Sequence, residues 1–112
     1  MNKVGDRVGA ILGRTEEGET KFLGYGVYEG EGVPIEAVGP IAEALVETKS
    51  TNPMIRLDSG SVVYGCECWW GPEDEVKRNL ENIKVKKVDI DDVRLEYLEN
   101  NKEADKDAET TE

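Results

Sequence analysis

Residues 57–73, LDSGSVVYGCECWWGPE, decide the fold because they predict a turn, a long strand and the start of a helix in succession. Asp58-Ser59-Gly60 has the composition of a tight turn. The stretch from Ser61 to Trp70 is rich in β-branched and aromatic residues and predicts the longest strand of its sheet. Gly71-Pro72 ends that strand, and Pro72 suits the first turn of a helix.

Alternation along the predicted strand separates its side chains into two faces. One face is almost wholly apolar and carries Val62, Tyr64, Cys66, Cys68 and Trp70. The other face carries Val63, Gly65, Glu67 and Trp69. An aromatic ring beside glycine backbone and an acceptor carboxylate fits a planar ligand, with Glu67 binding donors on its edge. The alternative is that Trp69 packs under a helical insertion or in a subunit interface.

The two cysteines favour a buried structural role. A structural zinc site usually needs four ligands, and the chain has no histidine and no second cysteine pair. A Cys-x-Cys pair on a strand also lacks the helix-start environment that lowers a thiol pKa. The absence of histidine excludes the usual Ser-His-Asp and Cys-His catalytic arrangements. We therefore expect a non-enzymatic protein that has no catalytic residue and binds no metal or cofactor.

The rest of the chain predicts four more strands and two more helices. The strands are expected at 4–14, 21–29, 54–57 and 84–90, and the helices at 40–49 and from Asp91 or Asp92 onward. The helix that begins at Pro72 carries an apolar stripe of Val76, Leu80 and Ile83. These elements predict an α+β fold, with a small, strongly bent antiparallel sheet of about five strands and two or three short helices. The sheet either closes as an SH3-like barrel or stays open with helices on one face.

We expect one domain over residues 1–99, with a helical insertion at 34–52. Residues 100–112, NNKEADKDAETTE, are predicted to form a disordered acidic tail. An open sheet of this size has exposed edges, which favour a homo-oligomer.

The formal net charge of −11 argues against direct nucleic-acid binding through phosphates. No apolar run reaches the length of a membrane span, and the N-terminus lacks the apolar core of a signal peptide. We expect a cytosolic protein without membrane contacts.

An anionic ligand would need the few cations of the sheet region. These are Arg7, Arg14, Lys21 and Arg56. Tyr28 is the tyrosine better placed to join Trp69, because it shares a predicted strand face with Phe22 and two glycines. The predicted ligand set is Trp69, Glu67, Tyr28, Arg7, Arg14 and Arg56.

Four segments resemble a family of small uncharacterised proteins encoded by tailed bacteriophages. They are GDRVGAIL, FLGYGVYEGEGVP, NPMIRLDSGSVVYGCECWWGPEDEV and VDIDDVR, and they span residues 4–94. The most specific part is LDSG followed by GCECWWGPE, while residues 34–52 and the acidic tail lie outside the pattern.

The resemblance implies a setting, namely the cytoplasm of an infected bacterial host, where small acidic phage proteins often block a defence system. Three functions follow as expectations. The first is an oligomeric protein that sequesters a small nucleotide signal, with its base on Trp69 or Tyr28 and its phosphates on Arg7, Arg14 or Arg56. The second is an acidic inhibitor that occludes a basic surface of a host nuclease or another nucleic-acid-binding defence protein. The third is a virion or replication accessory protein.

Overall fold

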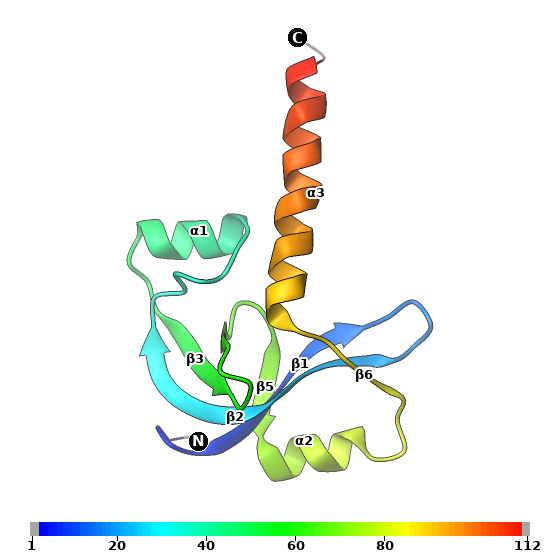
Figure 1. The fold of residues 1–112 in the computed structure, drawn as a ribbon. Helices are drawn as coiled ribbons and strands as arrows, with labels where there is room; N and C mark the ends of the chain where they lie inside the picture. Colours follow the sequence, from blue (N-terminus) through cyan, green and yellow to red (C-terminus); the bar gives the residue numbers. More distant parts are fainter. Residues whose placement is uncertain (1–2, 111–112) are drawn as a thin grey trace.

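A computed structural model describes residues 3–110 of the chain and the side chains of residues 3–100 (Figure 1). The fold is α+β with one sheet and three helices, as predicted. The strands are β1 Arg7–Arg14, β2 Thr20–Gly32, β3 Asn52–Leu57, β4 Val62–Tyr64, β5 Trp69–Pro72 and β6 Val85–Lys87. The helices are α1 Pro40–Glu47, α2 Glu73–Leu80 and α3 Ile90–Thr110.

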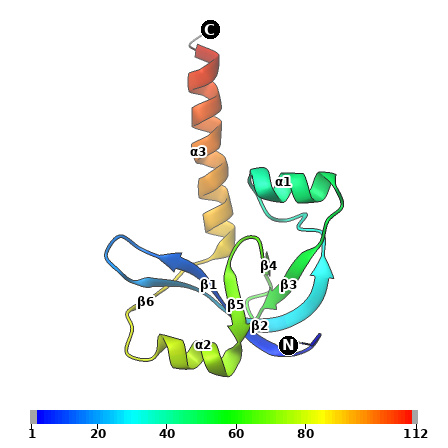
Figure 2. The ribbon, with the colours of Figure 1, turned by 180° about the vertical axis from the view of Figure 1, so that it is seen from behind.

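The sheet has the strand order β4-β3-β2-β1-β5, with antiparallel pairing throughout this path. The short β6 adds to β2 in parallel. The long β2 bends strongly across the molecule (Figure 1). A turn, not a ladder of hydrogen bonds, connects the two outer strands β4 and β5, so the sheet is open and bent. The helices cover both sides, with α1 and α3 on one side and α2 on the other (Figure 2).

The single strand predicted over Ser61–Trp70 is wrong, because the chain turns at residues 65–68 and forms two strands at opposite ends of the sheet. The turn is stabilised locally. The backbone N–H of Glu67 donates to the carbonyl of Tyr64 at 2.9 Å, and the Glu67 carboxylate accepts the Tyr64 N–H at 3.1 Å. These two bonds replace the strand hydrogen bonds that the alternation pattern assumed.

The core lies between the bent sheet and the base of α3. Val8 and Ala10 are fully buried and Leu12 packs against them, which confirms the predicted inner face of the first strand. The remaining buried members of the cluster are Leu23, Ile55, Leu57, Val63 and Ile90. On the opposite face, Val76 of α2 packs over Gly9, where an added Cβ would lie 2.8 Å from its Cγ1.

The helices differ from their predicted bounds, and α1 ends at Glu47 instead of residue 49. Helix α2 stops at Leu80, so Ile83 lies outside it and is exposed. Helix α3 begins at Ile90, and its cap is Asp89, not Asp91 or Asp92, because the Asp89 carboxylate accepts the N–H of Asp91 at 2.8 Å.

Helix α3 begins at the sheet, and its axis points away from the sheet (Figure 1). Residues 100–110, which we expected to be disordered, continue this helix; residues 111–112 of the expected tail lie outside the described part. Extending an existing helix avoids the cost of nucleation, so a polar sequence can continue it. Over the described residues, no helix is long and apolar enough to span a bilayer.

Candidate functional site: the α1–α3 cleft

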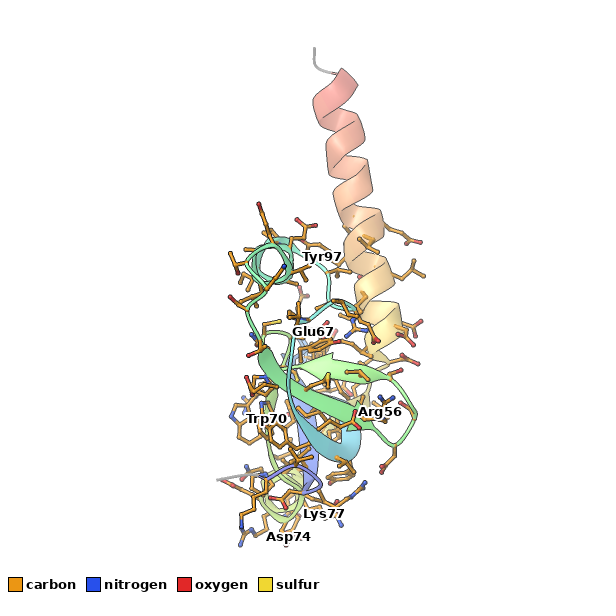
Figure 3. All side chains as sticks on the ribbon, turned by 90° about the vertical axis from the view of Figure 1, so that its left-hand side faces the viewer. Arg56, Glu67, Trp70, Asp74, Lys77 and Tyr97 are labelled. Atoms are coloured by element: carbon orange, nitrogen blue, oxygen red, sulfur yellow. The ribbon has the colours of Figure 1, made fainter. Side chains whose placement is uncertain are left out.

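A cleft opens between α1 and α3 above the turn that joins β4 to β5. Its volume is about 270 Å³. We call it the α1–α3 cleft, and it is lined by Leu12, Val38, Gly39, Pro40, Ile41, Ala42, Cys66, Glu67, Ile90, Val93, Arg94 and Tyr97. Figure 3 shows Tyr97 and Glu67 in this region, above Trp70 on the sheet. An apolar cavity with a few converging polar groups is the usual form of a binding site.

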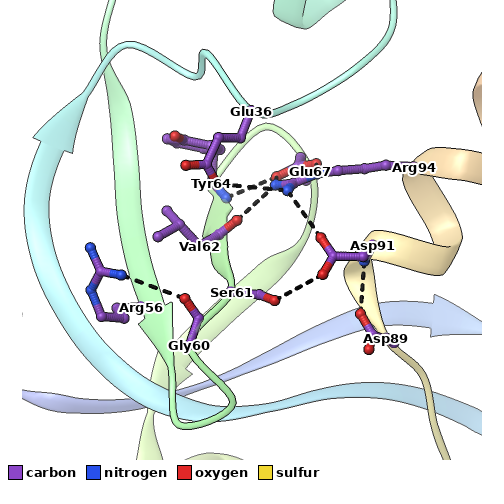
Figure 4. A network of polar contacts seen from close by, with 10 residues as sticks. All are labelled: Glu36, Arg56, Gly60, Ser61, Val62, Tyr64, Glu67, Asp89, Asp91 and Arg94. Atoms are coloured by element: carbon purple, nitrogen blue, oxygen red, sulfur yellow. Dashed lines mark hydrogen bonds and ion pairs between the residues drawn. The ribbon is translucent and has the colours of Figure 1, made fainter.

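The polar floor of the cleft is an ion pair between Arg94 of α3 and Glu67 of the turn (Figure 4). The Arg94 guanidinium donates from Nη2 to Glu67 Oε1 at 2.6 Å and from Nε to Oε2 at 2.9 Å. Each side chain is only 10% exposed. Burial lowers the pKa of Arg94, but the hydrogen bonds and charge of Glu67 outweigh it and raise that pKa above its ordinary value. Arg94 therefore stays cationic in its buried position.

The same pair closes the outer edge of β4. Arg94 Nη2 also donates to the Val62 carbonyl at 2.7 Å, and Glu67 accepts the Tyr64 N–H. Along β4, every second residue forms its backbone hydrogen bonds with β3. The backbone N–H and C=O groups of Val62 and Tyr64 point the other way, where a further strand would bind them. The expected position of Glu67, outward and beside Trp69, is therefore wrong. Its carboxylate is held inside the fold.

Two more carboxylates lie near Arg94, outside the residues that line the cleft, and we call them the rim carboxylates. Glu36 Oε2 is 3.9 Å from Arg94 Nη1, and Asp91 Oδ1 is 4.0 Å from the same atom. Glu36 is 52% exposed and Asp91 is 69% exposed. Asp91 also accepts the Ser61 hydroxyl at 3.3 Å. Because Glu67 takes the strong bonds of Arg94, these two rim carboxylates remain largely hydrated and open to another cation.

The upper wall depends on Gly39, which precedes α1 with a φ of 106°. A Cβ at this position would lie 3.3 Å from the Tyr97 hydroxyl, so the glycine lets α3 approach the start of α1. Ile41 on α1 is 70% exposed beside this contact. The cleft thus has apolar walls that reach the surface.

The cysteines are reduced, and their surroundings disfavour the thiolate. Burial, followed by the charge of Glu67, raises the pKa of Cys66, which lines the cleft. Burial raises the pKa of Cys68 to about 12. Among the described side chains, no group of three or more cysteines and carboxylates is placed to hold a metal ion.

The aromatic residues predicted for the ligand site lie apart from one another. Trp69 is 51% exposed, and its ring lies over Gly71, where an added Cβ would be 3.3 Å from Cη2. Tyr28 stacks on Trp70, with 5.1 Å between the ring centroids, and its hydroxyl donates to Glu31 at 3.2 Å. Tyr28 therefore does not join Trp69 in one pocket.

Two of the three predicted arginines are engaged with carboxylates of their own chain. Arg7 forms a bidentate pair with Asp58 at 2.7 and 2.8 Å and binds Glu73 at 2.7 Å. Arg56 binds Glu29 at 3.0 Å. Arg14 lies opposite Thr20 at the end of β1 and, within the described side chains, makes no ion pair. The structure does not gather the predicted set into one site.

Sequence reasoning missed Arg94 and Tyr97. Together with Ile90 and Val93 they occupy positions i, i+3, i+4 and i+7 of α3, which is one face of a helix. An arginine inside an apolar stripe was the available signal for a buried ion pair. Compared with protein-family models, curated proteins and solved structures, the chain shows no match, so its function has to be argued from this geometry.

Proposed function

We propose that this chain is a non-enzymatic acidic binding protein that occludes a basic surface on a partner protein. In the setting that the phage resemblance implies, the partner is a host nuclease or another nucleic-acid-binding defence protein, and binding takes place in the host cytoplasm. The chain would compete with nucleic acid for the partner's cations.

The observation that carries this proposal is the charge of the α1–α3 end of the molecule. Up to residue 100, these two helices carry six exposed carboxylates, which are Glu43, Glu47, Asp91, Asp92, Glu96 and Glu99. Their one cation in this range is Arg94, which is buried against Glu67. Exposed Ile41, Leu95 and Leu98 add apolar area to the same end. A surface of one sign with apolar contacts favours a partner of opposite charge.

The direct test is displacement of DNA from purified bacterial nucleases. Each nuclease of a panel is bound to fluorescently labelled duplex DNA under conditions that prevent cleavage, and the chain is titrated in while anisotropy is followed. We expect release of the DNA from a susceptible nuclease, and weaker release as salt is added, since screening reduces attraction between exposed charges. Retention of DNA by every nuclease contradicts the proposal.

A second candidate is sequestration of a nucleotide signal at Trp69. One observation supports it: the Trp69 ring lies next to Gly71 and Trp69 is half exposed, which leaves ring surface for base stacking. Trp69 pairs with Ile11 across β5 and β1, and Ile11 and Arg14 line a groove of about 270 Å³. Glu67, Tyr28, Arg7 and Arg56 are engaged elsewhere, which makes this the weaker candidate.

Nucleotide binding is tested by thermal shift against cyclic and linear nucleotides. A tightly bound nucleotide raises the melting temperature substantially. If the nucleotide stacks on the Trp69 ring, Trp69→Ala abolishes this rise. The accessory-protein function and the homo-oligomer stay predictions. For self-association through a sheet edge, the outer edges of β5 and β6 are candidates, because Arg94 and Glu67 occupy that of β4.

A further inference from the structure

We infer that the α1–α3 cleft binds one aliphatic side chain of a basic partner segment, whose flanking lysines or arginines lie against Glu36 and Asp91. The inference rests on the proposed function, since it assigns the contact surface through which a basic partner is recognised. Of the residues that line the cleft, the sequence pattern indicated Glu67 as a ligand residue but none of those on α1 or α3.

The size of the cleft suits a single side chain. Pockets that enclose a drug-sized ligand have volumes of roughly 300–1,000 Å³. The α1–α3 cleft, at about 270 Å³, lies just below that range. It accommodates a leucine or isoleucine side chain and leaves room for the backbone that carries it.

The lining selects an aliphatic group. Leu12 and Val93 contribute apolar surface inside the cleft, and Ile41 contributes it at the mouth. Glu67 does not need a ligand, because each of its carboxylate oxygens already accepts a hydrogen bond from Arg94. Burying an aliphatic side chain here removes apolar area from water without leaving a buried polar group unpaired.

The rim selects the charge of the flanking residues. Glu36, in the turn before α1, and Asp91, in the first turn of α3, both lie near Arg94 and are both more than half exposed. Their distances of 3.9 and 4.0 Å from Arg94 are too long for strong hydrogen bonds, so a partner's cations can bind them without breaking one. The α1–α3 end of a second copy is a poor occupant, because it is equally acidic.

The experiment uses a synthetic peptide with one leucine between pairs of lysines. Two counterparts carry alanine in place of leucine, or glutamates in place of the lysines. Binding to the full-length chain is followed by two-dimensional amide NMR. We expect the lysine–leucine peptide to shift the amides of Gly39, Ile41, Cys66 and Val93, while those of Trp69 and Gly71 stay in place. The alanine peptide should bind roughly tenfold more weakly, and the glutamate peptide should not bind.

Matched variants separate the cleft from the general acidity of the surface. Ile41→Ser should weaken the lysine–leucine peptide several-fold, whereas Val46→Ser, on α1 but outside the cleft lining, should not. Glu36→Gln with Asp91→Asn should weaken it roughly twofold to fivefold per carboxylate, and Glu43→Gln with Glu47→Gln, at the same net charge, should have a smaller effect. Native amide dispersion of each variant shows that it is folded.

The outcomes distinguish this inference from the proposed function. Shifts that map away from the cleft, or equal effects of Ile41→Ser and Val46→Ser, overturn the cleft assignment even if DNA is displaced from a nuclease. If the chain displaces DNA from no nuclease but the peptide shifts are confined to the cleft, the proposed function is overturned, and the cleft remains a binding site for basic segments.

Discussion

Arg94 donates hydrogen bonds to both carboxylate oxygens of Glu67, at 2.6 and 2.9 Å. This pair connects α3 to the turn between β4 and β5. The guanidinium also reaches the Val62 carbonyl, so one side chain joins the helix, the turn and the edge of β4. The position of α3, and with it one wall of the α1–α3 cleft, depends on this contact.

Replacing Arg94 by alanine should lower the free energy of unfolding by about 3 kcal/mol, because it leaves Glu67 and the Val62 carbonyl without their partner in a largely buried site. Urea unfolding followed by far-UV circular dichroism measures the loss. The control is Arg56→Ala, since its pair with Glu29 is more exposed and should contribute much less. Equal losses in the two variants would show that the Arg94 pair has no special role.

Acid should destabilise the fold through the cluster around Arg7. Hydrogen bonding from Arg7 lowers the pKa of Asp58, and hydrogen bonding from Lys77 and Arg7 lowers that of Glu73. A carboxyl with a lowered folded pKa stabilises the protein above its unfolded pKa, near 4, and this stabilisation is lost as the pH falls through the folded value.

The corresponding measurement is the urea midpoint of wild type and Asp58→Asn at a series of pH values. The difference between them should be largest near neutral pH and should shrink below about pH 4. Asp92→Asn, an exposed carboxylate outside the cluster, serves as the reference. A difference that stays constant down to pH 2 contradicts this explanation.

The thiols should react slowly in the folded protein. With a pKa of about 12, Cys68 is almost wholly protonated at pH 7.5, and burial also raises the pKa of Cys66. Reaction with Ellman's reagent at pH 7.5 should be slow in buffer and fast in denaturing urea. Rapid modification of the native protein would instead indicate an activated cysteine.

Gly26 should not tolerate a side chain, because the backbone of the neighbouring strand β3 lies very close to it. An added Cβ would lie 2.7 Å from the Leu57 Cα and even closer to the Arg56 carbonyl oxygen, and both are backbone atoms that cannot move aside. Gly26→Ala should therefore cost about 1–3 kcal/mol in thermal or urea unfolding. Gly32→Ala in the same strand is the control, since its new Cβ would meet only the flexible side chain of Met54. Similar stability of both variants would refute the argument.

Local signals predicted much of the fold. Pro40 and Pro72 marked the starts of α1 and α2, and alternation placed Val8 and Ala10 in the core. Alternation failed where the backbone is irregular. In β2 the pairing register shifts around Gly24, whose φ is 140°, so Leu23 and Tyr28 both pack on the core although they were predicted on opposite faces.

The candidate site was less predictable because it depends on contacts between distant segments. Nothing near Glu67 in the chain indicates that Arg94 will pair with it, and without that pair the turn at residues 65–68 looks like a continuous strand. Cys68, Trp69 and Trp70 still alternate as predicted, with Trp69 exposed and its neighbours packed on the core. The sequence predicted the helix α3, but not the cleft that its Ile90–Tyr97 face lines.

DNA displacement by two variants of equal net charge tests the central claim most directly. One variant neutralises the α1–α3 end with Glu43→Gln, Glu47→Gln, Glu96→Gln and Glu99→Gln; the other neutralises Glu16, Glu17, Glu75 and Glu81 in the same way, away from that end. The assay uses a nuclease from which the wild-type chain displaces labelled DNA. We predict that the first variant no longer displaces the DNA and that the second variant still does. Equal displacement by both variants would contradict recognition through the α1–α3 end.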